Sequence, residues 1–462
     1  MTMKIKSINP SNEEIIGEVS ASSIEEVNSA ISTAKESFSS WKNAKIEERI
    51  KLLKKLSELL EKEKTNFTEL IMREIGKPKK EAETEVLDSQ GAIDYYCKKI
   101  KEIKEKNIGF DQENFPKTKG SVKFEPHGVI GLITPWNYPL SLPMWTIIPA
   151  LLTGNTIVYK PSENSVLVGQ KIDKIINQVF PKGVFNTIYG DSEIGKILVK
   201  SDIDKLFFTG SVEAGQDIIK NIGIKPVALE LGGKDSAIIC KDADLELAVK
   251  GIVWGALNNA GQVCTSTEKV YVSEEIADRF IKMVVKEVKK LRKGVDFGPL
   301  ANKDQLNKVE NHVKQAISEG AKILTGGKKI EGKGFFFEPT VLVNVKEEME
   351  IMCEETFGPI IPIKTVKNED EAIELTNNSK YGLGATIWTE DIGKGKEIGE
   401  KLNVGMIWIN DVNLPISGGD YWGGTKLSGL RCSESKLMQC LKAKTFVSYS
   451  GKDKRDWWYP YN

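Results

Sequence analysis

The hydrophobic pattern of residues 23–104 has the period of amphipathic helices. Ser23, followed three residues later by Glu26, forms a capping-box sequence, and apolar residues then recur at helical spacing. The same pattern continues through 46–60, 68–75 and 81–103. In the segment 46–60, lysines and glutamates occupy the other face. We interpret the charged positions as solvated faces of helices that pack on a larger core.

Between residues 156 and 239 short apolar runs alternate with amphipathic segments. The predicted strands are 156–159, 184–189, 205–208, 227–231 and 237–240, and the helical runs include 165–179 and 192–200. Alternation of this kind predicts a doubly wound parallel sheet. Ligands of such sheets bind at the carboxyl ends of the strands.

The alternation resumes after residue 264, which predicts a second doubly wound α/β domain. We expect strands at 269–272, 322–324, 336–344 and 405–410, and helices at 274–293, at 303–318 and from about Glu434. Residues 110–124 break the helical pattern and predict a β-hairpin or an extended arm. Residues 445–450 alternate as a strand does and could pair with that arm.

Residues 128–159 contain no charged side chain, which raises the question of a membrane segment. Four prolines interrupt this stretch, and each removes a backbone donor, so a buried segment between domains is the better interpretation. The whole chain of 462 residues has 65 basic and 65 acidic side chains, which disfavours nucleic acid as a partner. The amino terminus lacks the apolar core of a signal peptide, so we expect a cytoplasmic protein.

Cys264 lies in a loop of small and polar residues, 258–268, between a predicted helix and a predicted strand. A thiol in such a place is a candidate nucleophile, although cysteines are often inert core residues. The six cysteines are scattered without a C-x-x-C pair, which argues against a metal site and a disulfide framework. His127 and His312 are the two histidines; neither has a motif around it, so a Cys–His hydrolase is disfavoured.

Two strand ends carry groups suited to a nucleotide. Lys160 and Glu163 follow the strand 156–159. The segment 207–215 runs from strand through a glycine turn at Gly210 into a helix, whose free N–H groups would suit a phosphate. It is not a G-x-G-x-x-G fingerprint, so this signal by itself is weak.

Taken together, seven segments resemble the motifs of the aldehyde dehydrogenase superfamily in order and spacing. They are 134–139 (TPWNYP), 160–163 (KPSE), 208–211 (FTGS), 230–234 (ELGGK), 261–265 (GQVCT), 354–359 (EETFGP) and 423–429 (GGTKLSG). The resemblance covers nearly the whole chain. It implies an NAD(P)-binding domain at 1–107 and 127–235, a catalytic domain at 236–435, and an oligomerisation arm and tail at 108–126 and 436–462. Members of the family are commonly dimers or tetramers, so a homodimer or homotetramer is expected.

The resemblance also implies the chemistry. Cys264 would add to an aldehyde to form a thiohemiacetal, and the Asn137 amide together with the Cys264 backbone N–H would stabilise the alkoxide. A hydride would pass to NAD(P)+, and Glu230 would activate the water that hydrolyses the thioester. An unperturbed thiol has a pKa of about 8.5, so we expect the site to activate Cys264.

Further residues are expected, by the same resemblance, to bind the cofactor. Glu355 and Phe357 would hold the nicotinamide end, while Lys160 and Glu163 would contact the adenosine ribose. Gly210 and Ser211 would meet the pyrophosphate, with Trp136 either near them or in the core. A carboxylate at Glu163 repels a 2′-phosphate, which favours NAD+ over NADP+.

The sequence departs from the family pattern at 414–422 and at 430–433, which leaves the aldehyde undetermined. The aromatic tail 457–461 is interpreted as a contact with a neighbouring subunit rather than a lipid anchor. Two alternative functions remain: a thiol hydrolase or esterase, and an inactive binding protein with the same fold.

Overall fold

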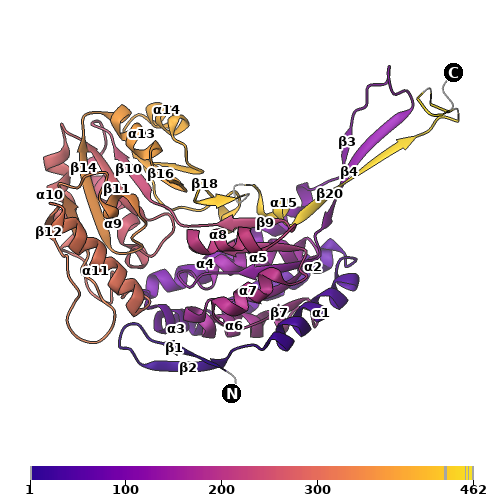
Figure 1. The fold of residues 1–462 in the computed structure, drawn as a ribbon, viewed down its shortest axis with the longest axis horizontal. Helices are drawn as coiled ribbons and strands as arrows, with labels where there is room; N and C mark the ends of the chain where they lie inside the picture. The colour runs from indigo at the N-terminus through magenta and orange to yellow at the C-terminus, as the bar shows by residue number, and fades with distance from the viewer. Residues whose placement is uncertain (1–2, 431–433, 453, 456, 460–462) are drawn as a thin grey trace.

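A computed structural model describes residues 3–430, 434–452, 454–455 and 457–459 of the chain. Two α/β bodies lie side by side and a thin β arm projects away from them (Figure 1). Both bodies contain a sheet that is mostly parallel, as the sequence predicts. None of the described helices combines the length and the apolar composition needed to cross a membrane.

Four helices precede the first sheet: α1 (Ile24–Trp41), α2 (Ile46–Lys62), α3 (Lys64–Ile75) and α4 (Lys79–Lys99). Ser23 and Glu26 form the expected capping box at the start of α1. A hairpin of β1 (Lys4–Ile8) and β2 (Ile15–Ser20) comes before them and was not predicted. Its turn residues Asn9 and Pro10 are the signal that could have revealed it.

The first sheet has the strand order β19-β9-β8-β5-β6-β7. Its strands are β5 (Val129–Ile133), β6 (Thr156–Lys160), β7 (Phe185–Thr187), β8 (Lys205–Thr209), β9 (Val227–Glu230) and β19 (Gly429–Leu430). Its helices are α5 (Ser141–Leu152), α6 (Val166–Asn177), α7 (Ser192–Lys200) and α8 (Val212–Asn221). All residues of α5 are buried, which explains the charge-free stretch 128–159. Gly429 pairs antiparallel with Glu230, so the chain returns to the first sheet after leaving the second.

The second sheet has the order β12-β13-β14-β11-β10-β16-β17, in which only β12 and β13 pair antiparallel. Its strands are β10 (Asp235–Ile239), β11 (Thr267–Ser273), β12 (Lys322–Thr325), β13 (Thr340–Val343), β14 (Ile360–Val366), β16 (Gly384–Trp388) and β17 (Met406–Ile409). Its helices are α9 (Leu245–Leu257), α10 (Ala277–Val288), α11 (Lys303–Ser318), α12 (Glu350–Cys353), α13 (Glu369–Asn377) and α14 (Ile392–Lys401). A small pair, β15 (Tyr381–Gly382) and β18 (Thr425–Lys426), links the two bodies.

Several predicted boundaries are wrong. The strand expected at 336–344 begins only at Thr340, because Pro339 lacks a backbone donor and Phe337 is used in the core instead. The helix expected at 274–293 is limited to α10. The helix expected from Glu434 is the single turn α15 (Lys436–Gln439), after which the chain enters a long strand.

The arm consists of β3 (Lys106–Ile108), β4 (Thr118–Pro126) and β20 (Leu441–Tyr449). β20 pairs antiparallel with β4 along its whole length, from Leu441–Pro126 to Tyr449–Thr118. The predicted pairing of the tail strand with the earlier segment is therefore confirmed. In the aromatic tail, Trp457 contacts Phe115 of the arm edge to face and is half exposed, whereas Tyr461 lies outside the described residues.

Candidate active site

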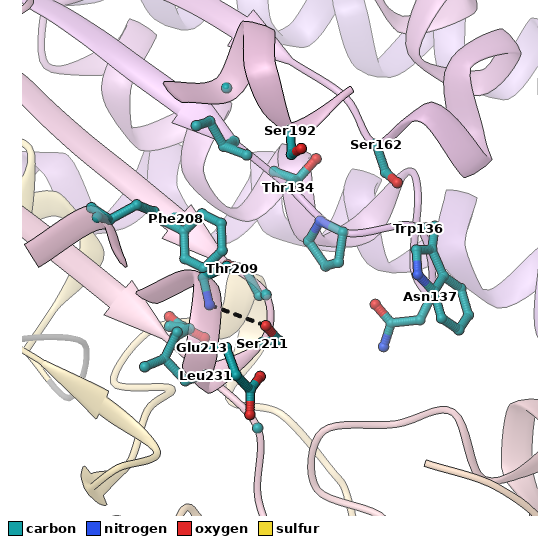
Figure 2. A pocket seen from close by; sticks show the side chains of 18 of the residues that line it. Thr134, Trp136, Asn137, Ser162, Ser192, Phe208, Thr209, Ser211, Glu213 and Leu231 are labelled. Carbon is teal, nitrogen blue, oxygen red and sulfur yellow. Dashed lines mark hydrogen bonds between the residues drawn. The ribbon is translucent and has the colours of Figure 1, made fainter. Parts of the chain in front are cut away.

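A cleft of about 670 Å³ opens at the carboxyl ends of β5, β6, β8 and β9. This is where a doubly wound sheet binds its ligand, and the volume lies in the range of small-molecule sites. All ten residues selected from the sequence line it: Trp136, Asn137, Lys160, Glu163, Gly210, Ser211, Glu230, Cys264, Glu355 and Phe357. Figure 2 shows Trp136 and Asn137 at one side of this cleft and Ser162, Ser192 and Ser211 further along it.

Lys160 and Glu163 lie at one end of the cleft. The Lys160 side chain is buried, its Nζ is 3.7 Å from a Glu163 carboxylate oxygen, and it donates to the Pro161 carbonyl. Burial lowers the pKa of Lys160. The Glu163 side chain is 44% exposed, so its carboxylate is free to accept hydrogen bonds from hydroxyl groups in the cleft.

The turn after β8 leads into α8, and its first residues face the cleft. Ser211 caps this helix by accepting a hydrogen bond from the Ala214 N–H at 3.2 Å, as Figure 2 marks. The remaining N–H groups of the first turn and the helix dipole favour an anion there. The exposed Ser211 and the neighbouring Gly210 fit the predicted phosphate contact.

The loop after α12 carries Glu355 and Phe357 into the cleft. Glu355 accepts a hydrogen bond from the Gly233 N–H at 3.0 Å, and burial together with the nearby Glu268 raises the pKa of Glu355 to about 7. The Phe357 ring meets Trp136 edge to face, with centroids 5.6 Å apart. Trp136 therefore belongs to the nicotinamide side of the proposed site rather than to the α8 turn.

Glu268 holds this loop in place, a role that sequence reasoning missed because no motif links Glu268 to the loop. Its carboxylate accepts hydrogen bonds from the backbone N–H groups of Thr356 and Phe357, each at 2.7 Å. Lys234 pairs with the same carboxylate at 2.6 Å, and both side chains are buried. Gln305 donates to the carbonyls of the same two loop residues. The loop is thus held through both the backbone N–H groups and the backbone carbonyls of Thr356 and Phe357.

The turn before Cys264 has an unusual backbone. Asn259, Ala260 and Gly261 all have φ between 49° and 75°, in the left-handed region. At Gly261 a side chain is excluded, because an added Cβ would lie 2.1 Å from the Gly358 carbonyl oxygen. This turn brings the thiol loop against the loop that carries Glu355.

Asn137 is buried and anchored to the thiol loop. Its Nδ2 donates to the Gln262 carbonyl at 2.9 Å, and the Asn259 side chain donates to the Asn137 carbonyl at 3.0 Å. One N–H of the Asn137 amide is left for a ligand in the cleft. Asn137 is therefore more than a cap of the turn before Pro139.

The expected activation of the Cys264 thiol is not found. Burial and the nearby carboxylates of Glu230, Asp235 and Glu355 raise the pKa of Cys264 far above its usual value. The thiol is consequently protonated at neutral pH. It can act as a nucleophile only after a base has taken its proton or a cation has entered the cleft.

Glu230 ends β9 and is buried. Burial raises the pKa of its carboxyl group, and an ion pair with Lys436 opposes that shift. Neither histidine lines the cleft. His312 is buried, its Nδ1 lies 3.2 Å from the Thr356 hydroxyl, and burial lowers its pKa to about 4.

A thiol, a carboxylate and an amide thus meet at one end of a cleft whose other end suits a dinucleotide. A profile of the aldehyde dehydrogenase family matches residues 1–446. The chain belongs to the aldehyde dehydrogenase family, and it is an NAD(P)-dependent oxidoreductase that converts aldehydes to carboxylic acids.

Its relatives include enzymes with different aldehydes in their names. The chain is 38% identical to betaine aldehyde dehydrogenase of Bacillus subtilis over 440 residues, covering 91% of this chain and 89% of the relative. It is 37% identical to D-glyceraldehyde dehydrogenase (NADP(+)) of Picrophilus torridus, covering 96% and 93%. A crystal structure of betaine aldehyde dehydrogenase from Staphylococcus aureus with NAD+ superposes with a TM-score of 0.93, at 33% identity, covering 99% of this chain and 94% of that one.

Proposed function

We propose that Cys264 is the nucleophile of this aldehyde dehydrogenase, that Asn137 stabilises the alkoxide and that Glu230 is the base for thioester hydrolysis. The observation that carries the proposal is the meeting of these three groups in one cleft, from segments that lie far apart along the chain. The thiol sulfur bonds to the aldehyde carbon, and its proton leaves to a base. The carbonyl oxygen becomes an alkoxide that accepts hydrogen bonds from the Asn137 amide and the Cys264 N–H.

The bound nicotinamide supplies the hydride acceptor. Once the hydride has left, the carbon is held to Cys264 as a thioester. Glu230 then takes a proton from water, whose oxygen attacks the thioester carbon, and the C–S bond breaks to give the acid and the Cys264 thiolate. A buried carboxylate is suited to this step because its raised pKa makes it a stronger base than an exposed one.

The cleft residues fit a dinucleotide. Glu355 and Phe357 would hold its nicotinamide end, the start of α8 would hold its phosphates, and Lys160 and Glu163 would contact the adenosine ribose. We infer a preference for NAD+, since the Glu163 carboxylate accepts hydrogen bonds from ribose hydroxyls and repels a 2′-phosphate. Both cofactors occur among the relatives.

We also propose that the protein is a homodimer or homotetramer assembled through the arm. β3, β4 and β20 project from the body as a thin sheet (Figure 1). The side chains of Phe446 and Val447 in β20 are exposed. Apolar side chains on a projecting sheet are suited to burial against a second copy. Light scattering of the intact chain and of Val447→Asp tests this, and a monomeric wild type would refute it.

Cofactor reduction with an aldehyde panel tests the catalytic proposal. The panel includes betaine aldehyde, an aminoaldehyde and D-glyceraldehyde, each with NAD+ and with NADP+. Cys264→Ala should abolish reduction, whereas the matched control Cys353→Ala, on the exposed end of α12, should retain it. Reduction that survives Cys264→Ala would refute the thiol mechanism.

A further inference from the structure

A lysine is paired with the proposed base. The Lys436 ammonium donates to a Glu230 carboxylate oxygen, although 206 residues separate the two in sequence. The side chains are only 5% and 9% exposed, so water screens this pair little. A base must be ionised before it can take a proton, and burial by itself disfavours the ionised form of Glu230.

The backbone around Lys436 is anchored from the other side. The Lys436 N–H donates to Asp420 Oδ1 at 2.7 Å, and Tyr95 donates to Asp420 Oδ2 at 2.8 Å. The Ser435 hydroxyl lies 3.3 Å from the same oxygen. Asp420 is itself buried. These contacts hold the start of α15 so that the Lys436 side chain can reach the end of β9.

The other groups near Glu230 do not replace this cation. The thiol loop contributes Cys264, α4 contributes Tyr96, and neither carries a positive charge. Among the residues that the structure describes, Lys436 is the one cation paired with Glu230. The charge balance of the base therefore depends on this lysine.

We propose that Lys436 is a positioning residue for thioester hydrolysis, which holds the Glu230 carboxylate in place and ionised through their buried ion pair. The inference rests on the proposed role of Glu230. In the step itself a water proton moves to Glu230, the water oxygen bonds to the thioester carbon, and the C–S bond breaks so that Cys264 leaves as a thiolate. The adjacent Lys436 ammonium favours loss of the proton from Glu230 to solvent before the next turnover.

The test is the pH dependence of kcat for Lys436→Met in the full-length protein. Without the ammonium, Glu230 should ionise at higher pH, so the acid limb of kcat should move to higher pH. We expect the acid limb to shift by about one pH unit or more. At pH values below the limb, kcat should be about tenfold lower than in the wild type, because the ionised fraction of a base falls tenfold for each pH unit below its pKa. The hydride-transfer phase should change less, so a burst of reduced cofactor should become larger.

Matched variants separate charge from packing. Lys436→Arg should restore the acid limb, and Lys436→Gln, which keeps a hydrogen-bond donor without the charge, should shift it as Met does. Lys394→Met removes a different lysine, which is paired with the Glu369 and Asp242 carboxylates. This control should leave the acid limb of kcat in place. If Lys436→Met does not fold, Lys436→Gln decides the question.

An acid limb that stays in place in both Lys436→Met and Lys436→Gln would overturn the inference. Glu230→Gln is measured in parallel. If Glu230→Gln hydrolyses the thioester at the normal rate, the proposed role of Glu230 fails, which is a separate result. If Glu230→Gln is slow while the Lys436 variants keep the normal limb, only the inference about Lys436 fails.

Discussion

Replacing Glu268 with glutamine should loosen the loop that presents Glu355 and Phe357 to the cofactor. The amide oxygen of the glutamine can still accept a hydrogen bond, as one carboxylate oxygen of Glu268 does. Its NH2 group, however, is a donor, and it would face another donor, either a loop N–H or the Lys234 ammonium. Hydrogen bonds to a charged acceptor contribute about 1.5–3 kcal/mol each. Lys234 would also be left buried without a carboxylate partner, and breaking a buried ion pair in this way costs about 3–5 kcal/mol.

We therefore expect Glu268→Gln to lower the free energy of unfolding by about 3–5 kcal/mol, in the range for a broken buried pair. The change is measured by urea unfolding at neutral pH. KM for NAD+ should rise at the same time, because Glu355 and Phe357 are no longer fixed. The loss of the Glu268 charge should also lower the pKa of Glu355, which that charge helps to raise.

Two controls isolate the cause. Glu354→Gln removes a neighbouring carboxylate whose side chain is 39% exposed and pairs with Lys380, so its effect on stability should be about 0–1 kcal/mol. The double variant Glu268→Gln, Lys234→Met removes both charges and should be more stable than Glu268→Gln alone. A loss below about 1 kcal/mol in Glu268→Gln, with unchanged KM for NAD+, would refute the reasoning, since one broken charged hydrogen bond already exceeds it.

Three further predictions concern single groups of the cleft. Gly261→Ala should inactivate the enzyme, because its Cβ would lie 2.1 Å from the Gly358 carbonyl oxygen and would displace the thiol loop; normal turnover of a folded variant would contradict this. Affinity for NAD+ should increase as the pH rises through about 7, where Glu355 becomes ionised and can accept two hydrogen bonds, and titration of binding should show this dependence lost in Glu355→Gln. Glu163→Gln should raise kcat/KM for NADP+ relative to NAD+ by about tenfold or less, since the exposed charge is screened by water; an unchanged ratio would count against the NAD+ preference.

Unfolding should also respond to pH through Glu355. In the folded protein the pKa of Glu355 is about 7, above the usual value for a glutamate. The folded protein therefore binds this proton more tightly than the unfolded chain does. The stabilisation from this proton is complete below pH ~4, near the unfolded pKa, and is lost as the pH rises through about 7. Glu355→Gln should reduce this part of the pH dependence in urea unfolding.

The sequence by itself determined the local elements and the chemistry of the proposed site. The capping box at Ser23 and Glu26 and the helical spacing after it are local signals, and α1 begins where they predict. Alternating strands and helices were sufficient for the fold class, because a parallel sheet needs such crossovers. Cys264, Asn137 and Glu230 were found through motifs whose order along the chain matches the family.

Tertiary structure alone decided how distant segments pair. Lys436 meets Glu230 across 206 residues, and Glu268 meets the Thr356 N–H across 88, without any motif that links them. The raised pKa of Cys264 likewise arises from burial between segments and from carboxylates that are remote in sequence. Short-range patterns record which side chains can pack or react. The charge balance around a buried group depends on which segments surround it, and only the folded chain brings those segments together.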